Sequence, residues 1–469
     1  MIRFTINNNR TTISGDELLV EECAKAFAFK HPNAHWIRQS LAYEWDGKVW
    51  PVTKAGSFKT GFITQVIDWL SEWEEDYEIL DHRHVPELLD IPYEVGGLRM
   101  EGKFAYQRDA IKAIVYNSFL GEPHPRGIIA AAVNAGKSTI MMGVHMSYEG
   151  ARTLILMNNK VLYEQFRDDL AKAFPDDYGY MQGRKLKWGK IMVVMVQTLK
   201  NRLKEHAAQL KEFNILLTDE CDLANNATFD AVYRNLKHIS IRAGFTGTVF
   251  LRDLKKDKVR NTKMREIFGE AIFEIDPIQL EELGVSTETV VKSVYANPYE
   301  VGGLGFKEEF DELITHNEER HELIYNRLRY NLKSGRKHIM VFCKFIEQAE
   351  ILFQYLQPKF KKTTINFTHH KRSSEEIIHG FRDGKINILI TTLYLKRGMN
   401  FPLTEVIINA SGGEFYSGPL QILGRGVRTA AGKTKFFYED LYDEGKFLGK
   451  HSRRRIQYYK KVGYDVRFV

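Results

Sequence analysis

The chain has 469 residues, of which 43% are hydrophobic and 12% aromatic, a composition typical of packed globular domains rather than disorder. Its length predicts about three domains, and no apolar run approaches the ~18 residues that cross a bilayer. The first residues lack the apolar core of a signal peptide, and the three cysteines are far apart without metal-ligand spacing. We therefore expect a cytoplasmic protein with reduced thiols and no membrane partner.

Residues 1–95 form the first predicted unit, a small accessory domain. They carry 9 Lys and Arg against 16 Asp and Glu, although the whole chain has a net charge of +7. The basic excess therefore lies in the remaining residues, as a partner with a polyphosphate backbone would require. A basic solvated surface explains the same excess. The acidic stretch Glu72–Asp90, followed by Gly96 and Gly97, indicates where this domain ends.

Residues 96–285 and 286–469 form two further predicted domains. In each, short apolar segments alternate with amphipathic ones, as in 128–133 and 215–218 of the first and 338–342 and 386–391 of the second. This alternation predicts an α/β fold, with parallel sheets covered by helices and with ligands at the carboxyl ends of the strands. The second domain ends in a basic tail, which is either a phosphate-contacting arm or a solvated terminal helix.

A phosphate-binding loop is predicted after the apolar segment 128–133. The loop runs through Asn134, Ala135, Gly136, Lys137, Ser138 and Thr139. Small residues followed by Gly-Lys-Ser at a helix start direct backbone N–H groups at an anion. Ala131 stands where the pattern G-x-x-x-x-G-K-[ST] has its first glycine, so a helix start without a ligand is the alternative.

An acidic cluster, Asp219 to Asp222, follows the apolar segment 213–218. Two adjacent carboxylates after a strand allow Asp219 to hold a metal ion while Glu220 acts on a water molecule. A solvated strand end is the alternative. Near the end of the chain, 421–428 places Arg425 and Arg428 one helical turn apart, where they can stabilise the charge on a transferred phosphoryl group. An exposed basic helix face is the alternative there.

These elements, in this order, resemble the superfamily 2 helicases and translocases over roughly residues 100–430. The resemblance extends to Tyr106 and Gln107, which look like the adenine-reading Q motif. It also includes Thr246, Gly247 and Thr248, which look like motif III, the link between the ATP and nucleic-acid sites. Motif V is resembled by Thr391-Thr392 together with 397–400. Motif VI is resembled by 421–428. The resemblance implies two RecA-like parallel-sheet domains in tandem with a small N-terminal α+β domain.

Three shorter segments, 45–48, 251–253 and 268–270, are similar to the phage UvsW-type branch-migration helicases. This similarity implies a DNA motor that unwinds or branch-migrates forked or four-way DNA in replication, recombination or repair. If the chain is phage-encoded, its place is the host cytoplasm. Two alternatives stay open: a superfamily 2 RNA helicase, and an ATP-switched binding or annealing protein that does not unwind.

The resemblance also assigns roles around ATP and Mg2+. Lys137 contacts the β- and γ-phosphates, Ser138 and Asp219 hold Mg2+, and Glu220 orients or deprotonates the attacking water. Gln421, Arg425 and Arg428 act on the γ-phosphate. The residues expected to bind ATP are Tyr106, Gln107, Asn134, Ala135, Gly136, Lys137, Ser138 and Thr139.

Contacts to the DNA backbone are expected at strand ends and loops that offer polar or basic groups. A helix cap is the alternative for each of them, and no cluster of base-reading residues is visible. The predicted contacts are Asn158, Lys160, Gln197, Thr198, Thr392, Lys396 and Arg397.

Overall fold

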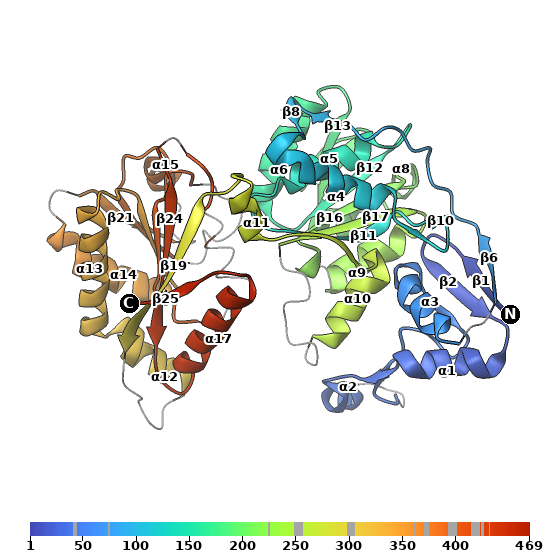
Figure 1. Cartoon of the computed structure of the whole chain (residues 1–469), viewed down its shortest axis with the longest axis horizontal. Helices are drawn as coiled ribbons and strands as arrows, with labels where there is room; N and C mark the ends of the chain where they lie inside the picture. The colour runs from blue at the N-terminus through green and yellow to red at the C-terminus, as the bar shows by residue number, and fades with distance from the viewer. Residues whose placement is uncertain are drawn as a thin grey trace. The chain divides into compact units, whose positions relative to one another are not determined.

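Figure 1 shows the computed structural model of the chain. The structure describes residues 1–40, 45–73, 76–223, 226–247, 257–297, 305–360, 363–369, 375–392, 401–413, 423, 426–430 and 432–469. The chain divides into two compact units. The first comprises 1–132 and 136–275, and the second comprises 133–135 and 276–469. The domain boundaries predicted from the sequence lie at 95 and 285, and residues 1–95 are part of the first unit.

The first unit begins with a small four-stranded sheet in the order β5-β2-β1-β6. Strand β1 pairs antiparallel with β2 and parallel with β6. Its apolar residues alternate inward, since Ile2, Phe4 and Ile6 are buried. Helices α1 and α3 add Cys23 and Val66 to the same core. The elements are β1 (Ile2–Ile6), β2 (Arg10–Ser14), α1 (Glu17–Phe27), β3 (Phe29–Lys30), α2 (Ala34–Ser40), β4 (Lys48–Val49), β5 (Ser57–Lys59), η1 (Thr60–Phe62), α3 (Ile63–Ser71) and β6 (Tyr77–Asp81).

The larger sheet of the first unit has eight strands in the order β14-β13-β15-β12-β16-β17-β11-β18. All its pairings are parallel except that of β13 with β14. The central strands are buried on both faces, which explains why they are continuous apolar runs in the sequence. The strands are β11 (Arg126–Ala131), β12 (Thr153–Met157), β13 (Tyr178–Gln182), β14 (Lys185–Lys187), β15 (Ile191–Met195), β16 (Ile215–Asp219), β17 (Ile241–Thr246) and β18 (Ala271–Ile275).

Helices cover this sheet, as the green part of Figure 1 shows. Their bounds are η2 (Gly102–Phe104), α4 (Ala105–Val115), α5 (Lys137–Met146), α6 (Lys160–Ala173), α7 (Val196–Arg202), α8 (Ala207–Leu210), η3 (Cys221–Leu223), α9 (Ala227–Asn235) and α10 (Lys258–Phe268). Two short strand pairs, β7 (Glu94–Val95) with β8 (Leu98–Arg99) and β9 (Ser118–Phe119) with β10 (Glu122–Pro123), complete the unit.

The small sheet region packs directly on helix α10 of the larger one. A Cβ on Gly61, in η1, would lie 2.4 Å from the backbone oxygen of Arg265 in α10, so only glycine permits this approach. Beside it, the Glu270 carboxylate accepts from Arg265 Nε at 2.8 Å and from Gln65 Nε2. Glu270 belongs to the segment 268–270 noted in the sequence, and here it ties the two parts together.

The second unit holds a seven-stranded sheet that is parallel throughout, in the order β21-β22-β20-β23-β24-β19-β25. Its strands are β19 (Glu288–Asn297), β20 (Ile339–Cys343), β21 (Ile365–Thr368), β22 (Ile388–Thr392), β23 (Val406–Asn409), β24 (Lys435–Asp443) and β25 (Val466–Phe468). Its helical elements are α11 (Pro277–Glu282), α12 (Phe306–Phe310), η4 (Asp311–Thr315), α13 (Glu318–Lys333), α14 (Ile346–Leu356), η5 (Gln357–Lys359), α15 (Glu375–Arg382) and α17 (Leu448–Lys461).

The basic tail forms helix α17, which packs on strand β24 by an ion pair. Arg455 is buried, and its Nε donates to Asp440 at 2.9 Å. The neighbouring carboxylates of β24 point to the other face, because side chains alternate along a strand. There Arg320 of α13 pairs with Asp443 at 2.9 Å. Removing one member of such a buried pair would leave an uncompensated charge, so these pairs hold both helices to the sheet.

Candidate nucleotide and nucleic-acid site

The predicted phosphate loop joins strand β11 to helix α5. Ala131 ends β11, and Lys137 begins α5. Asn134 and Gly136 have φ angles of 77° and 75°, and this left-handed region is one that glycine and asparagine tolerate best. The first N–H groups of α5 have no partner within the helix, which makes its N-terminus an anion-binding position. Ser138 and Thr139 lie in this first turn.

Tyr106 and Gln107, the pair that resembles the Q motif, lie on α4 next to this loop. A Cβ added to Gly136 would lie 2.3 Å from Gln107 Nε2, so the glutamine amide packs directly on the loop. Both side chains are almost fully buried, and burial raises the pKa of Tyr106. The structure thus brings together two sequence elements that are separated by 29 positions in the chain, from Gln107 to Gly136.

Asp219 ends strand β16 at the carboxyl edge of the sheet. Because β16 pairs with β17, and β17 with β11, this carboxylate and the phosphate loop lie at the same edge. Burial raises the pKa of Asp219, and the positive charge of Lys137 opposes that shift. Lys137 Nζ itself donates to the Ala131 backbone oxygen at 3.1 Å.

Asp219 also fits a magnesium ligand by its own contacts. The residue is 8% exposed, and within the described part of the chain its Oδ1 atom has no hydrogen-bond partner. A buried carboxylate oxygen without a donor suits a hard cation, because Mg2+ prefers oxygen ligands and is held by one or two carboxylates plus phosphates. Ser138 offers a hydroxyl from the first turn of α5.

Glu220 has an unusual backbone conformation, with a φ angle of 50°. A non-glycine residue in this region costs of order 1 kcal/mol or more and persists only where the surroundings impose it. Such strain is typical of active-site residues. The conformation of Glu220 turns the chain directly after β16. Leu223 N then donates to the Glu220 backbone oxygen at 2.9 Å, and this hydrogen bond closes the turn of η3.

Asp222, the last residue of the acidic cluster, is held by two donors. Thr246 Oγ1, at the end of β17, donates to its Oδ1 at 3.1 Å, and Arg260 Nη2, from α10, donates to its Oδ2 at 2.9 Å. All three side chains are buried or nearly so. Gly247 follows, and its Cβ would lie 3.6 Å from the Ala131 oxygen of the phosphate loop. Thr246, the first residue of the predicted motif III, thus contacts the acidic cluster. Arg260 was missed because nothing in its sequence context distinguishes it.

The predicted nucleic-acid contacts of the first unit follow strands β12 and β15, at the carboxyl edge that also carries Asp219. Lys160 and Gln197 are exposed, and Asn158 is half-buried. The capping alternative is realised by Asn159, whose side chain accepts from Val161 N at 2.9 Å. Thr198 Oγ1 is engaged too, because it accepts from Gly183 N at 3.1 Å.

In the second unit, Thr392 ends strand β22, where its buried Oγ1 has no hydrogen-bond partner in the described part of the chain. Arg428 lies on a backbone bridge to Ser286, and Lys433 Nζ donates to its oxygen at 3.2 Å. Lys433, which sequence reasoning also missed, is one residue that positions this segment. Of the remaining predicted site residues, Thr248, Lys396, Arg397, Gln421 and Arg425 lie outside the described residues.

This geometry defines a class of protein, the nucleoside triphosphatases. Its two features are a phosphate site between a strand and a helix and a carboxylate at the end of a neighbouring strand. Residues 102–251 match the family model described as "Type III restriction enzyme, res subunit", and residues 320–430 match the "Helicase conserved C-terminal domain". Both matches are to domains of helicase type, so the chain is similar to the superfamily 2 helicases in both of its units, and it is an ATP hydrolase of the helicase type.

Individual relatives agree with this class. The chain is 22% identical to "ATP-dependent DNA helicase uvsW" of Enterobacteria phage T4, over 97% of each protein. It is 24% identical to "Competence protein ComFA" of Streptococcus pneumoniae, over 53% of each, so it spans about half of that relative. Among solved structures, a single-substitution variant of S. cerevisiae Dbp5 bound to RNA and ADP BeF3 matches with a TM-score of 0.55 and 16% identity, over 81% of this chain and 96% of that one. The predicted fold, with two RecA-like parallel sheets in tandem, is confirmed.

Within the described ranges, no helix combines the length and the apolar character that a membrane span needs.

Proposed function

We propose that the chain is an ATP-dependent DNA helicase or translocase that unwinds or branch-migrates forked and four-way DNA in replication, recombination or repair, and that it acts in the cytoplasm. The observation that carries this proposal is the extent of the similarity to the T4 DNA helicase, which covers 97% of both chains and so includes most of residues 1–95. The Dbp5 structure contains RNA, and its likeness supports the fold alone.

For ATP, the proposed binding residues are those of the loop and of α4. The N–H groups at the start of α5 and the ammonium of Lys137 bind the phosphates, which draws Lys137 Nζ from the Ala131 oxygen. Gln107 packs on Gly136, where it would support the loop and, with Tyr106, contact the adenine. Ser138 and Asp219 would hold Mg2+, which would supply charge neutralisation at the β- and γ-oxygens.

Glu220 orients or deprotonates the attacking water in this proposal. Glu220 has a left-handed backbone, whereas Asp219 is still part of strand β16. The two adjacent carboxylates therefore leave the backbone differently, and we assign them different tasks. Asp222 does not join them, since Thr246 and Arg260 occupy its oxygens. From the second unit, Gln421, Arg425 and Arg428 would stabilise the charge that develops on the γ-phosphate.

Coupling to nucleic acid is proposed to pass through Thr246, Gly247 and Thr248. Thr246 links Asp222 to the end of β17, whereas the exposed polar groups Lys160 and Gln197 lie at the ends of other strands of the same sheet. Such groups contact phosphates without reading bases, as a motor that moves through any sequence requires. Asn158, Thr198, Thr392, Lys396 and Arg397 are proposed for the same track.

The test is ATP-dependent conversion of a labelled four-way DNA junction, measured beside a forked DNA and an RNA duplex of matched sequence, with wild type and Lys137→Ala. The proposal expects junction conversion by wild type alone. Opening of the RNA duplex only would refute the DNA assignment and leave the ATP site standing. Turnover of ATP without remodelling of any substrate would favour an ATP-driven switch.

A further inference from the structure

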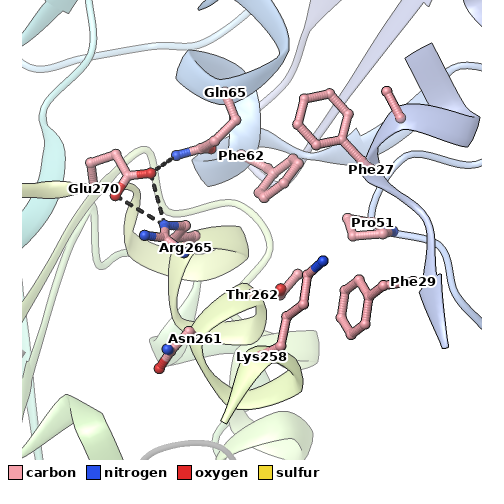
Figure 2. A pocket seen from close by; sticks show the side chains of 11 residues that line it. Phe27, Phe29, Pro51, Phe62, Gln65, Lys258, Asn261, Thr262, Arg265 and Glu270 are labelled. Atoms are coloured by element: carbon pink, nitrogen blue, oxygen red, sulfur yellow. Dashed lines mark hydrogen bonds and ion pairs between the residues drawn. The ribbon is translucent and has the colours of Figure 1, made fainter. Parts of the chain in front are cut away.

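A cavity of about 550 Å³ lies between the small N-terminal sheet region and helix α10, away from the phosphate loop. Figure 2 shows that its two walls differ in character. Phe27, Phe29, Phe62 and Pro51 line the side of the N-terminal region, and polar residues of α10 line the other. None of the functions proposed above uses this cavity.

The aromatic wall offers flat apolar surface. The rings of Phe27 and Phe62 meet edge to face, with centroids 5.2 Å apart, which leaves Phe29 as the separate ring of the wall. Phe29 is only half-buried, and Lys258 Nζ lies 4.5 Å from its centroid. The ammonium lies over one face of the ring, and a flat ring together with a cation suits a ligand that is aromatic and carries a negative charge.

Two buried amide atoms of the cavity lack partners. Asn261 is 5% exposed, and its Nδ2 has no hydrogen-bond partner in the described part of the chain. Gln65 donates through Nε2 to Glu270, while its Oε1 accepts from no described group. An apolar ligand would leave both atoms unsatisfied, at a cost. A nucleobase edge, which carries both donors and acceptors, would satisfy them.

The charge of the cavity indicates how many phosphates accompany the base. Arg265 is paired with Glu270 at 2.8 Å, so its charge is compensated. Lys258 forms no ion pair with any carboxylate in the described ranges, which leaves one uncompensated cation among the lining residues. One ammonium matches a single phosphodiester, whereas a free triphosphate needs several donors.

We propose that this cavity holds one unstacked nucleotide of a single DNA strand, with its base on Phe29 and its phosphate at Lys258. The proposal rests on the DNA-directed function given above. It also gives α10 a second role, because Arg260 of the same helix holds Asp222 of the acidic cluster. Occupancy of the cavity therefore bears on the helix that positions the ATPase motif.

The test is fluorescence anisotropy of a labelled oligodeoxythymidylate, compared with an abasic strand of equal length and a duplex. Phe29→Leu keeps apolar volume and removes the flat ring, so the full chain should bind oligodeoxythymidylate about fivefold or more weakly. Binding of the abasic strand and of the duplex should not change, nor should ATP turnover without DNA. The matched control is Tyr116→Leu, which removes an exposed aromatic ring that does not line the cavity.

Three outcomes would overturn the proposal. They are unchanged affinity of Phe29→Leu for oligodeoxythymidylate, equal weakening for the abasic strand, and competition by excess thymidine monophosphate, which would indicate a free-nucleotide site. Binding of oligouridylate alone, still weakened by Phe29→Leu, would refute the DNA function and keep the base pocket. If Phe29→Leu lowers the thermal midpoint, Lys258→Gln, on the exposed start of α10, replaces it. This variant should weaken binding of both single strands, because the abasic strand keeps its phosphates, and unchanged affinity for both would overturn the proposal.

Discussion

Arg260 is predicted to support the acidic cluster by satisfying Asp222, and Arg260→Met removes that support while keeping an unbranched side chain of similar reach. In the native chain the Arg260 side chain is 11% exposed and that of Asp222 is 5% exposed, with a separation of 2.9 Å. The variant leaves Asp222 buried with the hydrogen bond from the Thr246 hydroxyl still in place. Loss of one partner from a buried pair costs about 3–5 kcal/mol. We expect the lower end, about 3 kcal/mol, because one hydrogen bond remains.

The tryptophans make this measurement selective. All six lie between Trp36 and Trp188, so their fluorescence reports the first unit within the full chain. With an m-value of about 3 kcal/mol per M, the urea midpoint of this transition should fall by about 1 M. Asp222→Asn alone should also be destabilising, and the double variant should cost less than the sum of the two single changes.

The reasoning would be refuted by a midpoint shift below about 0.2 M for Arg260→Met, or by single effects that simply add in the double variant. Arg234→Met is the matched control, because the Arg234 side chain is exposed and donates to the backbone oxygen of Asp230, without a carboxylate partner in the described part of the chain. A comparable shift of the urea midpoint for Arg234→Met would show that replacing an arginine is itself destabilising, whether or not it pairs with a carboxylate.

Three further changes address the phosphate loop and pH. Lys137→Ala should lower ATP turnover at least about 100-fold in a phosphate-release assay while leaving the urea midpoint nearly unchanged, because its charge serves the phosphates. Gly136→Ala should abolish binding of a fluorescent ATP analogue, since the new Cβ meets Gln107 Nε2 at 2.3 Å and φ is 75°; full binding would contradict this geometry. Burial lowers the pKa of His145 from 6.5 to about 4, so the neutral form is native. The stability it contributes is present above pH 6.5 and is lost as the pH falls towards 4, by about 3 kcal/mol in all. His145→Gln should show a smaller fall of the tryptophan-monitored urea midpoint over that window, and an equal fall would count against the assignment.

The fold was predictable because parallel sheets leave a local trace in the sequence. Strands such as β12 and β16, buried on both faces, must be apolar throughout, and the alternation with helices then requires a parallel order. The phosphate loop and the acidic pair were visible for a related reason. Their chemistry occurs at strand ends, so the functional residues directly follow the apolar runs that predict the strands.

The residues that sequence reasoning missed act across long distances in the chain. Arg260 reaches Asp222 across 38 positions, and Lys433 donates to the Pro402 oxygen across 31. An isolated Arg or Lys in an amphipathic helix or a loop looks like ordinary surface in the sequence. The basic tail shows the reverse effect. Its charge suggested an arm or a solvated helix. In the structure Arg455 forms a buried ion pair with Asp440, because a carboxylate on the buried face of β24 requires a partner.

The acidic charge of residues 1–95 argues against a phosphate-binding surface, and the proposed pocket accounts for it. There the N-terminal region supplies rings, and the cation, Lys258, comes from the basic remainder of the chain. Stacking does not depend on salt, whereas each neutralised phosphate of a single strand contributes about 0.7 to the slope of log affinity against log salt. Lys258→Gln should therefore reduce this slope by about 0.7, and Phe29→Leu should weaken binding equally at every salt concentration. Titrations of oligodeoxythymidylate over a salt series measure both. A slope that changes with Phe29→Leu and not with Lys258→Gln would reverse the assigned roles of ring and ammonium.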